Sequence, residues 1–105
     1  DFIHVSDVAR AFILVSKNNK LGFSTYNVCT GQATSLKNLI EMASSLLGYT
    51  LKFRYENKRL GDLYCAVGSN LKIKKECNFV PRITIRDGLR LVLKEAGAIT
   101  LQKVM

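Results

Sequence analysis

The sequence lacks the residue clusters from which metal and redox sites are usually built. Its 105 residues include one histidine, His4, and an odd number of widely spaced cysteines with no C-x-x-C pair: Cys29, Cys65 and Cys77. Zinc sites and redox dithiols need closely spaced ligands, so neither is predicted, and no disulfide framework is expected. We expect buried or half-buried thiols in a reducing compartment, and therefore a cytoplasmic protein. His4 lies in an apolar run and is predicted to be a structural, hydrogen-bonded residue.

Targeting, membrane and catalytic motifs are also missing. No signal-peptide pattern opens the sequence, and no apolar stretch approaches the ~20 residues of a membrane span. The G-x-G-x-x-G, G-x-x-x-x-G-K-[ST] and G-x-S-x-G motifs do not occur, and no tyrosine stands four residues before a lysine. The sequence therefore predicts no catalytic residue and no cofactor site in this chain. It is typical of a ligand-binding part without a catalytic part.

Acidic residues are scarce, with eight against sixteen basic residues and a net charge of +8. Such an excess suits a polyanion, a membrane surface or a phosphorylated small molecule. The cations form no long block and no nucleic-acid-binding motif is present, which favours a solvated surface. Neither a nucleic-acid nor a membrane partner is expected, although a basic nucleic-acid-binding module remains an alternative function.

Hydrophobic periodicity predicts four helices, over residues 7–16, 36–47, 70–77 and 85–96. Their expected N-caps are Ser6, Thr34 or Ser35, Ser69 and Thr84. Short runs rich in β-formers predict three to four strands, at 2–5, 25–28, 51–55 and 63–67. Strands alternating with helices indicate an α/β fold, and the length fits one domain.

The turn from Lys58 to Asp62 closes the alternating segment 51–55 and carries the best candidate ligand contacts. Arg59 offers a planar fork of donors that suits a phosphate or carboxylate, and the Asp62 carboxylate can accept hydrogen bonds from hydroxyls. Gly61 allows a close backbone approach or a positive φ. An ordinary charged surface turn has the same composition, so the residues alone leave both interpretations open.

Several segments, in this order, resemble motifs of the extended short-chain dehydrogenase/reductases. These are NAD-dependent nucleotide-sugar epimerases and dehydratases such as UDP-glucose 4-epimerase. Residues 1–11 resemble "RD[FY]IHVxDxAxA", residues 26–31 resemble "YNVGTG", and residues 34–36 resemble "TS[VL]". Residues 59–62 resemble "RxGD", residues 69–81 resemble "DxSKAxxxLGWxP", and residues 83–89 resemble "xxLxEGL".

The resemblance implies that residues 1–105 are a C-terminal substrate-binding fragment without the Rossmann half and its Tyr-x-x-x-Lys pair. It assigns Arg59 to the diphosphate and Asp62 to the ribose side of a UDP-type nucleotide-sugar. NAD would belong to the parent family and not to this chain, so whether the chain is an enzyme stays open. Departures from the motifs include Cys29 in place of a glycine and Gly68 in place of an alanine.

The fragment character also bears on partners. In the family the "YNVG" segment joins the nucleotide-binding sheet, which this sequence does not contain. Uncovered edges and apolar faces recruit partners, so a homo-oligomer is predicted. A structural or oligomerisation fragment with no ligand is a second alternative function.

Overall fold

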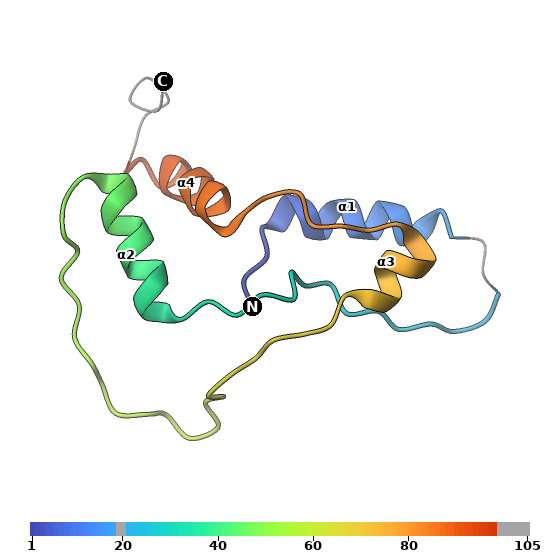
Figure 1. Cartoon of the computed structure of the whole chain (residues 1–105), viewed down its shortest axis with the longest axis horizontal. Helices are drawn as coiled ribbons and strands as arrows, with labels where there is room; N and C mark the ends of the chain where they lie inside the picture. The colour runs from blue at the N-terminus through green and yellow to red at the C-terminus, as the bar shows by residue number, and fades with distance from the viewer. Residues whose placement is uncertain (19–20, 99–105) are drawn as a thin grey trace.

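Four helices joined by long irregular segments make up the described part of the chain (Figure 1). The computed structural model describes residues 1–18 and 21–98. The helices are α1 (Val5–Ser16), α2 (Leu36–Leu47), α3 (Leu71–Cys77) and α4 (Ile85–Glu95). Each lies within two residues of a predicted helix, because the apolar spacing that predicts them also forms the faces they bury.

Side-chain caps fix where most of these helices begin. The hydroxyl oxygens of Ser35 and Thr84 accept hydrogen bonds from backbone N–H groups at 3.1 Å, as predicted for α2 and α4. The prediction of Ser6 for α1 is wrong, because His4 Nδ1 accepts from the Ser6 N–H at 3.2 Å and the helix starts earlier. The prediction of Ser69 for α3 is also wrong, since Asn70 is the N-cap there.

The prediction of an α/β fold with three to four strands is wrong. No strand occurs in residues 1–18 and 21–98, and this part of the protein is a helical fragment. Alternation describes one side of a strand, but a ladder also needs a neighbour that accepts and donates the backbone hydrogen bonds. Ile3, Tyr26 and Val28 pack on the helical core instead. In the segment 51–55, the Leu51 N–H donates to the Ser44 hydroxyl oxygen, and residues 52–55 are exposed.

The core joins α1 and α3. Ala11 of α1, Ile73 and Cys77 of α3, and Phe79 beyond α3 are buried together. The surrounding half-buried side chains are Ile3, Leu14, Val15, Tyr26 and Val28. On the other side of the molecule α2 packs against α4. The segments that connect these two helix pairs therefore determine how the molecule is held together.

Much apolar surface remains uncovered. The radius of gyration is 16.8 Å, whereas a compact domain of this length has about 13 Å. Phe12 on α1 and Phe23 are largely exposed, as are Leu60 and Tyr64 in the loop between α2 and α3. Cys29 and Cys77 are buried, but Cys65 is exposed, which corrects the expectation of buried or half-buried thiols. Among the described helices, none is long and apolar enough to cross a membrane.

Candidate functional site

Arg59 and Asp62 lie together in the turn that the sequence singles out. The Asp62 N–H donates to the Arg59 carbonyl at 3.2 Å, and Asp62 Oδ2 accepts from the Arg59 N–H at 3.0 Å. The same carboxylate oxygen lies 3.6 Å from Arg59 Nε. Gly61 has a φ of 86°, so a side chain there would be strained. The backbone therefore keeps the guanidinium and the carboxylate side by side.

The surroundings of this turn are open. The side chains of Arg59 and Asp62 are 87% and 41% exposed, and within the described part of the chain each pairs only with the other. Figure 1 shows the segment between α2 and α3 as a wide loop away from the helices. Phe53 and Tyr55 form an edge-to-face pair with ring centroids 5.4 Å apart, yet both rings remain exposed. The turn thus presents its charges to solvent without a surrounding pocket wall.

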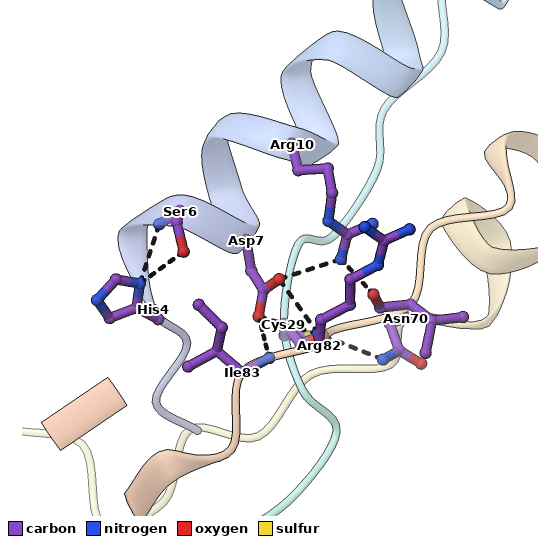
Figure 2. Close-up of polar contacts among 9 residues, drawn as sticks. His4, Ser6, Asp7, Arg10, Cys29, Asn70, Arg82 and Ile83 are labelled. Carbon is purple, nitrogen blue, oxygen red and sulfur yellow. Dashed lines mark hydrogen bonds and ion pairs between the residues drawn. The ribbon is translucent and has the colours of Figure 1, made fainter. Parts of the chain in front are cut away.

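A second pair of an aspartate and an arginine, Asp7 and Arg10, is far more buried than Arg59 and Asp62. The Asp7 carboxylate accepts hydrogen bonds from the backbone N–H of Arg82, at 3.2 Å, and of Ile83, at 3.0 Å (Figure 2). Arg10 Nη2 donates to Asp7 Oδ1 at 3.0 Å and also to the Val80 carbonyl. We call this group of residues the Asp7 clasp: Asp7, Arg10, Val80, Arg82 and Ile83. It ties the first turn of α1 to the chain that enters α4.

The pKa of the Asp7 carboxyl reflects these contacts. Burial raises this pKa, because it penalises the charged form. Hydrogen bonds from the Ile83 and Arg82 N–H groups and from Arg10 outweigh the burial and hold the pKa below its ordinary value of 3.8. The carboxylate is therefore charged at neutral pH, although its side chain is only 2% exposed.

Asp1 and Asn70 fix a neighbouring loop. Asp1 Oδ1 accepts from the Thr30 N–H at 2.9 Å and from its hydroxyl at 2.7 Å, while Asp1 Oδ2 accepts from the Gly31 N–H at 2.8 Å. Asn70 Nδ2 donates to the Cys29 carbonyl at 3.0 Å. These contacts leave the 29–31 backbone little freedom to move.

Gly68 packs closely against Cys29. A Cβ atom added to Gly68 would lie 2.8 Å from Cys29 Sγ, which is closer than real Cβ contacts. The cysteine stands where the related motif has a glycine, and the glycine stands where it has an alanine. The two departures therefore compensate for each other in volume.

Sequence reasoning found the turn but missed the clasp. The sequence pattern gives neither Asp7 nor Arg10 a role in a site. The spacing of three residues between them on a helix could have indicated an ion pair. No local pattern could have identified the partners of Asp7 at positions 82 and 83, because they lie more than seventy residues away.

The cation pattern bears on the nucleic-acid alternative. Arg10, Arg54, Arg59 and Arg90 form ion pairs within the chain, and Lys72 donates to the Thr25 carbonyl and lies over the Tyr26 ring. These five of the sixteen basic residues therefore have partners within the chain.

Within residues 1–18 and 21–98, the arrangement of the helices differs from that of a dinucleotide site. Such a site needs a glycine-rich turn between a strand and a helix, whose N–H groups face the pyrophosphate. The described helices instead begin at His4, Ser35, Asn70 and Thr84, and none follows a strand. No step that involves a nicotinamide cofactor can be derived from this chain.

Comparison with known proteins places these features in a family context. No family model matches the chain. It is 30% identical over 101 residues to a UDP-glucose 4-epimerase of Corynebacterium glutamicum, covering 95% of this chain and 30% of that protein. It is 32% identical over 87 residues to UDP-arabinose 4-epimerase 1 of Arabidopsis thaliana, covering 80% of this chain and 20% of that protein.

A solved structure is similar as well. The structure of RMD from Pseudomonas aeruginosa complexed with NADPH matches with a TM-score of 0.81 and 28% sequence identity. The match covers 90% of this chain and 31% of that chain. The present chain thus spans less than a third of the length of each of these relatives.

Proposed function

We propose that the chain forms the C-terminal, nucleotide-sugar-binding portion of an extended short-chain dehydrogenase/reductase, specifically an NAD-dependent epimerase of that family. Two of the relatives are named as epimerases of UDP-sugars, which supports a UDP-sugar as the ligand of this chain. The proposal makes the chain catalytically incomplete alone, with NAD held by another part of the enzyme. The free thiols support the cytoplasmic location that goes with this proposal.

The observation that carries the proposal is the Arg59 and Asp62 turn. A guanidinium suits the two negative charges of a diphosphate, and a carboxylate suits ribose hydroxyls. The backbone holds both groups within one turn, while their side chains stay exposed and have no other partner in the described ranges. We propose that Arg59 contacts the diphosphate and Asp62 contacts the ribose when the rest of the enzyme completes the binding site around this turn.

The uncovered apolar surface supports the proposal that this chain is only one part of an enzyme. Phe12 is 74% exposed on α1, and Phe23 and Tyr64 are more exposed still. Apolar area of this kind drives association, because each Å² removed from water contributes about 25 cal/mol. The remaining two thirds of such an enzyme is the natural cover for this surface.

A chimera tests the substrate assignment. In the Corynebacterium glutamicum relative, the matched region is replaced by this chain, and the KM for UDP-glucose and NAD binding are measured. We expect turnover of UDP-glucose, and we expect Arg59→Ala to raise KM at least about tenfold, as loss of a charge-assisted hydrogen bond would. Arg54→Ala is the matched control, because Arg54 is an exposed arginine of the same loop that pairs with Glu56.

Two results would contradict the proposal. One is a chimera that binds NAD but does not respond to UDP-glucose. The other is an equal effect of Arg59→Ala and Arg54→Ala, which would indicate general charge rather than a specific contact.

A second candidate function is self-association without a ligand, which the exposed apolar side chains also favour. Sedimentation velocity of the purified chain, with and without UDP-glucose, separates the two. A dimer or larger species that ignores UDP-glucose, combined with an inactive chimera, would favour the structural fragment. A monomer over a wide concentration range would exclude self-association as its role.

A further inference from the structure

A pocket of about 330 Å³ opens between the 30–34 loop, the start of α3 and the chain that enters α4. Its lining combines basic, hydroxyl and amide side chains over an apolar floor that includes Phe79. The polar members are Thr30, Gln32, Thr34, Asn70, Lys74, Arg82 and Thr84. No acidic residue lines it. The Arg59 and Asp62 turn is not part of this pocket.

The two cations of the pocket are available to a ligand. Lys74 and Arg82 form no ion pair within residues 1–18 and 21–98, in contrast to Arg10, whose charge is taken up by Asp7. The carboxylates of Asp1 and Asp7 contact the pocket lining by accepting hydrogen bonds from the backbone N–H groups of Thr30 and Arg82. The negative charges of these two carboxylates are therefore partly balanced by backbone N–H groups within the protein.

Both walls are held before any ligand arrives. Asp1 and Asn70 fix the backbone at Thr30. The Asp7 clasp fixes the backbone at Arg82, and Figure 2 shows Arg82 bonded to Asp7 and Asn70 bonded to Cys29. A preorganised wall costs little conformational entropy when a ligand binds. The pocket therefore meets a condition that the exposed Arg59 and Asp62 turn does not.

We infer that this pocket binds a phosphorylated monosaccharide, with Lys74 and Arg82 on the phosphate and the hydroxyl and amide side chains on the sugar. Its volume lies at the low end of the ~300–1,000 Å³ range of small-molecule sites, so it fits one sugar ring and a phosphate rather than a whole nucleotide-sugar. Guanidinium and ammonium groups both bind phosphate, and Thr34 and Gln32 offer the donors and acceptors that sugar hydroxyls need.

Calorimetric titration of the full 105-residue chain with glucose 1-phosphate tests this inference. Lys74→Gln and Arg82→Gln should each weaken binding at least about tenfold, because each removes one charge-assisted contact. Both side chains are exposed, and the backbone N–H of Arg82 that Asp7 needs is retained. Lys75→Gln is the matched control, since Lys75 is the next residue on α3 but does not line the pocket.

The outcomes are separable from those of the proposed function. Arg54→Ala, which removes a cation from the loop between α2 and α3, should leave the affinity for glucose 1-phosphate unchanged, and glucose alone should bind much more weakly. No binding of glucose 1-phosphate to the unmodified chain would overturn the inference. So would an equal loss in Lys75→Gln, or equal affinities for inorganic phosphate and glucose 1-phosphate, which would indicate unspecific attraction of an anion to a basic chain.

Discussion

Two pairs of the same residues, each three positions apart, behave oppositely in this molecule. Asp7 and Arg10 lie 3.0 Å apart with the carboxylate almost fully buried, whereas Arg59 and Asp62 lie 3.6 Å apart with the guanidinium 87% exposed. The first pair connects segments distant in the sequence, and the second connects nothing outside its own turn. Composition and spacing are equal, so the difference comes from what the rest of the chain brings to each pair.

The difference separates a structural role from a ligand-binding role. Both oxygens of the Asp7 carboxylate are used by backbone N–H groups or by Arg10, so this carboxylate has no acceptor capacity left for a ligand. The Arg59 guanidinium has donors to spare, and solvent screening makes its pairing with Asp62 weak. A ligand can therefore take over the second pair at little cost to stability.

The largest expected effect comes from breaking the first pair. Asp7→Asn should lower the free energy of unfolding by about 3 kcal/mol, because an amide cannot accept all of these donors and leaves Arg10 without its counter-charge. The matched change Asp62→Asn should cost no more than about 0.5 kcal/mol. Urea unfolding of both variants measures the two values, and equal losses would contradict the comparison.

A smaller effect is expected where the ordered region is packed most tightly. Gly68→Ala should lower the free energy of unfolding by about 2 kcal/mol, since the new Cβ would lie 2.8 Å from Cys29 Sγ. Cys29→Ala in the same chain should restore most of that loss by removing the sulfur. Thermal unfolding of the two single variants and the double variant gives the coupling. Additive effects would show that the two side chains do not compete for space.

The lowered pKa of Asp7 predicts how the free energy of unfolding depends on pH. Because the pKa of Asp7 is lowered in the folded state, its contribution to stability is complete above the unfolded pKa of 3.8 and declines as pH falls through the lower folded pKa. Unfolding free energies measured from pH 6 to pH 3 should therefore fall more steeply for the unmodified chain than for Asp7→Asn.

The smallest effect on stability is expected in the turn itself. Arg59→Ala should change the free energy of unfolding by less than about 0.5 kcal/mol, because exposed pairs contribute little. In the chimera described above, the same change should act on KM instead. A loss of stability comparable to that of Asp7→Asn would mean that the turn is structural and would remove the basis for its ligand role.

The helices could be predicted from the sequence because their signals are local. The apolar spacing of α2, its Ser35 cap and Gly48 at its C-terminal end all lie within fourteen residues, and the structure confirms them. The lack of strands in residues 1–18 and 21–98 could not be predicted. Tyr26 and Val28 alternate as strand residues do, but they pack on the core formed by α1 and α3. A β-pattern specifies a surface and does not specify the neighbour it pairs with.

The candidate site divides in the same way. The proximity of Arg59 and Asp62 follows from their own turn, so the residues and the resemblance were enough to find it, and its ligand remains a prediction. The pocket at Lys74 and Arg82 depends on Asp1 and Asp7 reaching loops about thirty and seventy-five residues away. The sequence carries no local sign of those contacts.

Amide hydrogen exchange of the chain, read residue by residue, tests most directly the claim that an ordered frame carries an open binding loop. The account predicts slow exchange at the Arg82, Ile83 and Thr30 N–H groups, which donate to buried or partly buried carboxylates, and fast exchange over residues 52–67. Asp7→Asn should accelerate exchange at Arg82 and Ile83. Equal protection of the loop and of the clasp in the unmodified chain would contradict it.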